Sequence, residues 1–314
     1  MKQISIILMS LFFSMATCAQ ERLITCSSEN NSDNSVSIYA ESTMFGQNSL
    51  KLTFTSLMGY STNFTLFSNS LIATVGPGKR EIIKLTPVKS AGSYSYQYRY
   101  QYFPGIALQK VPDSSFAYLL PARAGNQLRI SGVSSLSETF GPKKEEHYYG
   151  TGFTYQLADT ICASRGGTVY DCNDKIREGE TADVFFKSGR NKIAIQHKDG
   201  TLAEYMVLAP IHLLVKPGDY VYPGQPMAVF SMAAEKYTVL FSIWYSDEKK
   251  IMSDHSDSRT SSLSYLVYMQ PHFYVGENSK SVLLQLNKEY NVQHPVEIIT
   301  AEMSKKVKKK LGYL

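Results

Sequence analysis

The sequence predicts an all-β protein in which an N-terminal β-sandwich of the immunoglobulin-like kind precedes a second β-sheet domain. Three observations lead to this fold class. Short runs of β-branched and aromatic residues recur at regular spacing, and Asn, Gly and Pro separate them. An alternating stretch surrounds the dipeptide Asp199-Gly200, which is the strongest short-range signal for a hairpin. The sequence contains neither heptads nor internal repeats.

The first 19 residues have the pattern of a secretory signal peptide. Lys2 precedes an apolar run from Ile4 to Ala16, and small residues follow before Gln20. We expect cleavage after Ala19 and export of the mature protein to the periplasm, the cell envelope or the outside. The apolar run is too short to span a bilayer, and no later segment is apolar enough. Cys18 leaves a lipoprotein as an alternative.

The positive charge of the chain is concentrated near its C-terminus. The net charge of +5 equals the number of lysines in residues 305–310. The remainder is therefore close to neutral, which argues against a nucleic-acid partner. After cleavage Cys26, Cys162 and Cys172 remain, and the sequence allows either one disulfide or unpaired thiols.

Residues 20–108 form the predicted sandwich domain. Its first part, residues 20–34, is rich in Ser and Asn, and we expect it to be loose. The expected strands are Val36 to Ala40, Leu50 to Thr55, Phe64 to Phe67, Leu71 to Val75 and Glu81 to Leu85. A tyrosine ladder follows, formed by Tyr94, Tyr96, Tyr98, Tyr100 and Tyr102. It is either a ligand platform or, as we favour, a half-buried strand that faces the core.

A linker at residues 109–127 leads to the second domain, residues 128–247. Its central stretch runs from Asn191 to Tyr245. Ile193 and Ile195 alternate with other residues before the Asp199-Gly200 turn, and further turns at 215–219 and 222–225 separate two short apolar runs. Residues 171–183 are predicted to be an exposed loop. Residues 248–314 are predicted to be a C-terminal extension with two further strands and a short basic helix.

Several motifs of the second domain resemble the lysostaphin-type zinc endopeptidases, which cut peptidoglycan cross-bridges. They are IQHKDGTLAEYMVL, VKPGDYVYPGQPMA and the terminal strand KYTVLFSIWY. Upstream, residues 161–169 resemble the V-x-A-x-x-x-G-x-V hairpin of that family. The resemblance covers roughly residues 127–247, and it implies a lysostaphin-like β-sheet core.

The resemblance also implies where a zinc site would lie. The family uses a His and an Asp before the hairpin, a His near the end of the AEYxxL strand, and an H-x-H pair on the late strand. The corresponding positions here hold Tyr148, Gly152, Val207, Thr238 and Leu240. These residues cannot supply the three ligands that catalytic zinc needs. We therefore predict no metal, no cofactor and no catalytic residue.

The remaining histidines and carboxylates do not restore a site. His147 neighbours the first ligand position, but one imidazole holds no catalytic metal. His197 matches a family histidine that is not a ligand, and we expect a hydrogen-bonded strand residue. The other histidines are scattered along the chain: His212, His255, His272 and His294. The carboxylates Glu178, Glu180 and Asp183 belong to a solvated charge run.

The sequence thus favours an exported pseudo-peptidase that binds a cell-wall peptide, a glycan or an envelope protein. Two alternatives stay open. One is an active zinc endopeptidase that uses His147, a carboxylate and a second histidine as relocated ligands. The other is a structural protein of envelope assembly.

Overall fold

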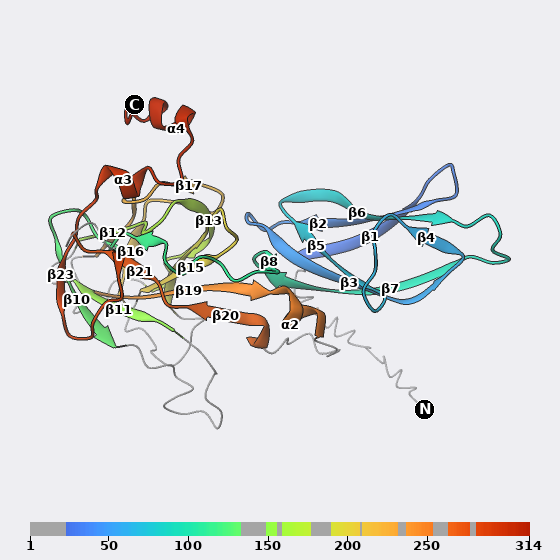
Figure 1. Cartoon of the computed structure of the whole chain (residues 1–314), viewed down its shortest axis with the longest axis horizontal. Coiled ribbons are helices and arrows are strands. Elements are labelled where there is room, and N and C mark those ends of the chain that lie inside the picture. The colour runs from blue at the N-terminus through green and yellow to red at the C-terminus, as the bar shows by residue number, and fades with distance from the viewer. Residues whose placement is uncertain are drawn as a thin grey trace, which may run out of the picture.

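The computed structural model describes residues 23–132, 149–155, 159–176, 190–207, 209–231, 237–253, 263–276 and 281–314. Strands dominate this part of the chain, which confirms the all-β class (Figure 1). The helical segments are short: α2 (Glu248–Ser253), η2 (Leu263–Tyr265), α3 (Val296–Ile299) and α4 (Lys305–Lys310). Within these ranges no helix has the length and apolar character needed to span a lipid bilayer. The expected signal peptide lies outside the described residues.

The N-terminal domain consists of two sheets that share one hydrophobic core. The first sheet has the order β1 (Ile24–Asn30), β2 (Val36–Ser42), β6 (Gly78–Pro87), β4 (Tyr60–Thr62). The second has the order β5 (Ser70–Val75), β3 (Asn48–Met58), β7 (Ser95–Pro104). Ile38 and Ile83 of the first sheet and Leu50 and Leu52 of the second are fully buried in the shared core. The sheets therefore pack face to face, while an immunoglobulin-like strand order stays a prediction.

Two sequence expectations for this domain were wrong. Residues 24–30, expected to be loose, form β1 and pair with β2 along their whole length. The backbone pairing and the buried Ile24 hold this strand, although its exposed positions are polar. Phe64 to Phe67 was expected to be a strand, but both phenylalanines are exposed. The chain turns directly after them, with positive φ at Ser68 and Asn69.

Four of the five tyrosines of the ladder face the core, as predicted, whereas Tyr94 precedes β7 and is 45% exposed. Tyr96, Tyr98, Tyr100 and Tyr102 are half-buried and pack against the sandwich core. The Tyr96 hydroxyl lies 3.2 Å from Ser28 Oγ of β1, in a hydrogen bond across the two sheets. Tyrosine suits such a position because its ring can be buried while its hydroxyl reaches the surface.

A ten-stranded sheet forms the centre of the second domain. Its main order is β17 (Tyr220–Val221), β13 (Gly167–Asn173), β14 (Asn191–Gln196), β15 (Leu202–Val207), β19 (Tyr237–Asp247), β11 (Thr151–Tyr155), β10 (Gln127–Gly132), β23 (Glu289–Asn291). Two more strands pair with β19, namely β20 (Leu266–Met269) and β8 (Ala107–Leu108). Strands β20 and β23, which follow residue 247 in the sequence, thus extend the same sheet.

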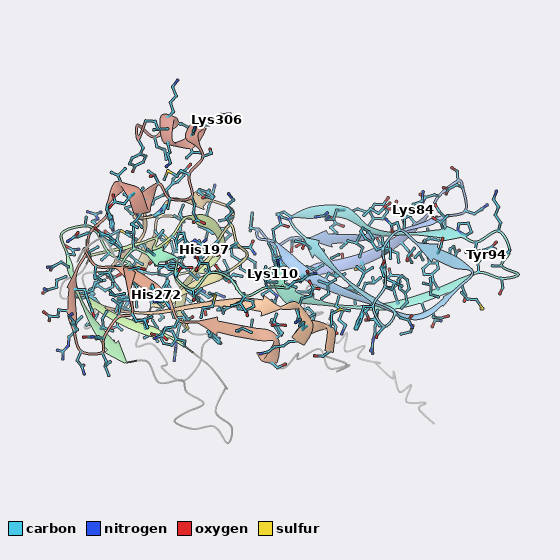
Figure 2. All side chains as sticks on the ribbon, viewed as in Figure 1. Lys84, Tyr94, Lys110, His197, His272 and Lys306 are labelled. Atoms are coloured by element: carbon cyan, nitrogen blue, oxygen red, sulfur yellow. The ribbon has the colours of Figure 1, made fainter. Side chains whose placement is uncertain are left out.

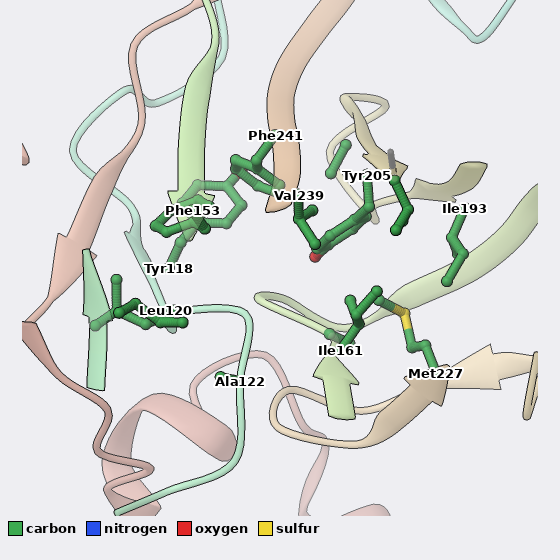
Figure 3. Packing of buried hydrophobic residues seen from close by; sticks show 14 of the residues in the cluster. Tyr118, Leu120, Ala122, Phe153, Ile161, Ile193, Tyr205, Met227, Val239 and Phe241 are labelled. Carbon is green, nitrogen blue, oxygen red and sulfur yellow. The ribbon is translucent and has the colours of Figure 1, made fainter. Parts of the chain in front are cut away.

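Two small sheets cover one face of the large one. They are β12 (Thr160–Cys162), β18 (Pro226–Phe230), β16 (Ile211–Leu213), and β22 (Ser281–Val282), β21 (His272–Tyr274), β9 (Ala117–Tyr118). The core lies between them and the large sheet, and Figure 3 shows Ile161 and Met227 opposite Tyr205 and Val239. Alternation along β19 places Val239, Phe241 and Ile243 in this core.

The turns of the central stretch form where the sequence predicted them. The register of β14 and β15 places residues 197–201 in the connecting loop, and Gly200 has φ +88°. Gly218 and Gly224 also have positive φ, so each glycine supplies a conformation that other residues rarely adopt. The prediction of a hairpin at residues 161–169 was wrong, because β12 and β13 belong to different sheets. Asp171 to Asn173, expected in a loop, complete β13.

Polar contacts join the two domains at one end of the large sheet. Gln196 Oε1 accepts a hydrogen bond from the backbone N–H of Gln47 at 2.7 Å, and its Nε2 donates to the Gln47 carbonyl at 2.8 Å. Ser246 Oγ of β19 donates to the Pro104 carbonyl at 2.6 Å. Figure 1 shows β19 running from the second domain to this junction.

Helix α2 attaches the end of β19 to the sandwich. Ile251 packs in a small buried cluster with Phe103 of β7 and Tyr265 of η2. The buried Lys51 of β3 donates from Nζ to the carbonyls of Ile251 at 3.0 Å and Met252 at 3.1 Å. The helix thus contacts the sandwich through both apolar packing and backbone carbonyls.

We expect Gln196→Ala to weaken the junction, because it removes two hydrogen bonds from a buried position. The free energy of unfolding should fall by about 1–3 kcal/mol, since the partly buried backbone groups of Gln47 lose their partner. Urea denaturation followed by fluorescence measures this. The control Gln97→Ala lies on the exposed side of β7 and should change stability by less than about 0.5 kcal/mol. Equal effects of the two variants would contradict the role of Gln196.

Candidate functional site

The candidate site is the face of the ten-stranded sheet opposite the core, which we call the outer face. Its residues are those that alternate with core residues and lie beside one another in register. They are Arg129, Ser131, Gly152, Thr154, Lys192, Ala194, Glu204, Met206, Thr238, Leu240 and Ser242. Strands β10, β11, β19, β15 and β14 each contribute to this set.

Three of the predicted zinc positions come together on the outer face. Gly152 of β11 is the direct cross-strand partner of Leu240 of β19. Thr238 lies two residues before Leu240 and so on the same face, where it pairs with Thr154. The side chains at these positions are a hydrogen atom at Gly152, a hydroxyl-bearing group at Thr238 and an alkyl group at Leu240. His147 and Tyr148 lie outside the described residues.

Val207 does not join these three positions. It pairs with Val239, and both side chains are fully buried in the core on the other side of the sheet. The expectation that Val207 shares a site with Thr238 and Leu240 was therefore wrong. The residue of β15 that lies beside Leu240 is Met206. Successive side chains of a strand point to opposite faces of the sheet, so a shift of one residue moves a side chain from one face to the other.

Close packing fixes the glycine at position 152. A Cβ atom there would lie 2.8 Å from the Ser131 backbone oxygen and 2.3 Å from its Oγ. The backbone of β10 cannot move out of the way as a flexible side chain can. An aspartate at this position would therefore require the two strands to shift.

The outer face combines apolar and hydrogen-bonding groups. Leu240 is half-buried, and Lys192 forms a 2.6 Å ion pair with Asp171 of β13. The Ser242 hydroxyl is buried and has no hydrogen-bond partner among the described residues.

The sandwich covers one end of this face. Gly105 approaches Leu202 and Trp244 so closely that a Cβ on it would lie 2.6 Å from Leu202 Cδ1. Gln196 at the same end is occupied by Gln47. The end that contains Gly152, Thr238 and Leu240 has no such contact with the sandwich among the described residues.

A second cluster of chemical groups lies on the core side, around Arg165. This side chain is almost fully buried in the loop between β12 and β13. It donates to both Glu302 carboxylate oxygens, at 2.8 and 2.6 Å, and to Asp199 Oδ2 at 2.7 Å. It also donates to the Tyr118 hydroxyl at 3.0 Å, and its guanidinium lies 3.9 Å from the centre of the Phe116 ring.

This cluster places two carboxylates beside one guanidinium. Burial opposes ionisation of both partners, but Arg165 lowers the pKa of Asp199 below its usual value, and Glu302 and Asp199 raise the pKa of Arg165. A bidentate guanidinium–carboxylate pair fixes geometry as well as charge. The cluster therefore ties the β14–β15 turn to the segment that follows α3. Of the residues in this cluster, the sequence pattern had indicated only Asp199, through the Asp199-Gly200 turn.

His197 adjoins this cluster inside the second domain (Figure 2). It directly follows β14, and its Nδ1 lies 2.9 Å from the Gly166 carbonyl, which confirms the expected hydrogen-bonded histidine. Its Nε2 is buried without a partner among the described residues. Burial and the charge of Arg165 lower the pKa of His197 to about 4. The ring is therefore neutral at pH 7.

The cysteines and other candidate residues form no site in the described part of the chain. Cys26, Cys162 and Cys172 are free thiols, and burial raises the pKa of each. No group of three or more His, Cys, Asp or Glu side chains that could hold a metal occurs among the described residues. His255, Glu178, Glu180 and Asp183 lie outside them.

Comparison of the chain with models of known protein families and with curated protein sequences finds no match.

We expect Arg165→Met to destabilise the protein strongly. The substitution keeps much of the volume but leaves Asp199 and Glu302 without their cation, and loss of one partner of a buried pair costs about 3–5 kcal/mol. Denaturant unfolding measures the loss. Arg123→Met is the control, because Arg123 is mostly exposed and lies 3.9 Å from Asp159, so about 1 kcal/mol or less is expected. A similarly small effect for Arg165→Met would refute the structural role.

The lowered pKa of His197 predicts a loss of stability in acid. An unfolded histidine has a pKa of about 6.5, so between that value and about 4 the unfolded state binds more protons than the folded one. The free energy of unfolding should thus fall as the pH drops from 7 to 4, with about 3 kcal/mol of the loss due to His197.

His197→Gln should reduce this acid-dependent loss, whereas His212→Gln on the exposed part of β16 should retain it. Urea unfolding at several pH values between 4 and 7 provides the comparison. If wild type and His197→Gln show the same pH dependence, the histidine is not neutral in the folded state.

Proposed function

We propose that the protein is an exported, catalytically inactive relative of the lysostaphin-type scaffold that binds a cell-wall peptide or glycan over its outer face. One observation supports this most. Gly152, Thr238 and Leu240 lie beside one another on β11 and β19, at the positions where the resemblance puts metal-binding and catalytic residues. Their side chains cannot hold a catalytic zinc ion, but they can form part of a binding surface.

The chemistry of the outer face suits a ligand with both apolar and polar groups. Leu240 provides partly exposed apolar surface beside the buried Met206, while Thr154 and Thr238 pair across the strands and can exchange hydrogen bonds with a ligand. Such a mixture of apolar contacts and a few placed polar groups is typical of ligand sites. Peptide stems and glycans of cell walls combine the same two kinds of group.

Hydrolysis by zinc is disfavoured by the packing at Gly152. Its contact with the Ser131 backbone leaves no space for the carboxylate that the resembled family places there. This packing supports a face that contacts a ligand and does not activate a water molecule.

Purified peptidoglycan sacculi provide the test. We expect the full-length protein to co-sediment with sacculi and Leu240→Lys to bind about tenfold more weakly, because the substitution places a charge on the binding face. The matched control is Leu214→Lys, in which an exposed leucine outside this face is changed. It should bind like wild type. Equal binding of the two variants would place the ligand elsewhere.

Metal analysis separates the proposal from the zinc endopeptidase. The purified protein should contain no stoichiometric zinc and should leave muropeptides uncut when zinc is added. One zinc ion per chain, with cleavage, would overturn the proposal. Failure to bind sacculi or muropeptides, together with stable binding of an envelope protein, would instead favour the assembly protein.

A further inference from the structure

The sandwich has four outer strands, and three of them carry features that protect an open edge. Exposed edges are protected in natural proteins by short length, charges, proline or bulges, because an open edge recruits other strands. Strand β4 has only three residues. Strand β7 contains Arg99 and Pro104 and shows a register shift against β3. Strand β1 contains Glu29, which forms a 2.5 Å ion pair with Lys79.

Strand β5 has none of these features. Its six residues, SLIATV, include no charge, proline or glycine. It pairs with β3 in regular register from Asn48–Val75 to Thr53–Ser70, without a bulge. It is the outermost strand of its sheet, so its other edge has no strand partner among the described residues. Ile72 and Ala73 are half-buried, and Thr74 is exposed.

A cavity of about 470 Å³ runs beside this edge. Residues 71–74 of β5 line it from one sheet, and residues 80–82 of β6 line it from the other. Strand β4 pairs with β6 only at residues 85–87, so this part of β6 also lacks a neighbour on the cavity side among the described residues. Phe64, Phe67 and Met252 also line it, together with the polar side chains of Gln109 and Glu248. Both sheets of the sandwich thus open toward one space.

The lining determines what fits there. Leu71 and Ile82 provide apolar walls, and Phe64 and Phe67 are 54% and 70% exposed at the rim. A strand edge presents backbone donors and acceptors at regular spacing, which only another extended backbone matches along its length. Since Phe67 and Met252 bound the cavity in addition to the two sheets, a single chain fits it better than the edge of a second folded copy.

We propose that this cleft binds an extended peptide segment of a partner protein, which adds to β5 as a further strand. Every second side chain of the segment is apolar and points between the sheets toward Leu71 and Ile82. The intervening side chains face solvent. Backbone hydrogen bonds to β5 supply affinity, and the apolar positions supply selectivity. This surface is separate from the outer face of the second domain, so the proposal does not depend on the proposed function.

A phage-displayed library of random ten-residue peptides, selected on the full-length protein, tests the proposal. We expect the enriched peptides to alternate apolar and polar residues. Thr74→Lys introduces a lysine into β5, a residue that protected edge strands commonly contain. It should lower the affinity for these peptides by about tenfold or more. Gln97→Lys makes the same change on β7, the opposite edge of the same sheet, and should alter affinity by less than about twofold.

Hydrogen exchange with the strongest peptide supplies a readout that needs no variant. Amides of residues 70–75 should exchange more slowly in the complex, and those of residues 95–104 should not change. The proposal is refuted if no peptide is enriched, if the enriched peptides bind Thr74→Lys as well as wild type, or if protection falls on β7. A dimer in sedimentation that Thr74→Lys dissociates would show that the occupant is a second copy of the chain.

Discussion

Strand β19 is the element on which both domains depend. It pairs with β15 and β11 along its first part and with β20 and β8 along its last part. Pairing on two sides satisfies its backbone groups inside the protein, and alternation then fixes where each side chain points. Because Val239, Phe241 and Ile243 must fill the core, Thr238, Leu240 and Ser242 must lie on the outer face. The core thus decides which residues of β19 lie on the outer face.

The fold was predictable where local chemistry determines it. Alternation and the Asp199-Gly200 turn specify β14 and β15, because a strand needs period two and the turn needs positive φ. Strand β1 was missed because its pairing with β2 compensates for a polar sequence. The wrong hairpin at residues 161–169 has a related cause. Two strands that are neighbours in sequence can join different sheets, and only their distant partners decide which.

The candidate site was predictable in part for the same reason. Counting residues along a motif placed Gly152, Thr238 and Leu240 on one face. It placed Val207 there as well, although its register with Val239 directs it into the core. The Arg165 cluster could not be predicted, since it joins residues from three distant segments. The three residues that accept hydrogen bonds from the guanidinium, Tyr118, Asp199 and Glu302, have no common sequence pattern.

The pairing of Arg165 with Glu302 has a consequence for how the chain is made. The two residues are 137 positions apart, and a ribosome releases the earlier one long before the later one is synthesised. Until then Asp199 is the only carboxylate of the cluster within reach of the guanidinium. The second domain therefore cannot complete this cluster before Glu302 has been synthesised. It reaches its final packing only after the segment that carries Glu302 has emerged, and a nascent chain stalled before that point would hold an arginine without its bidentate carboxylate partner.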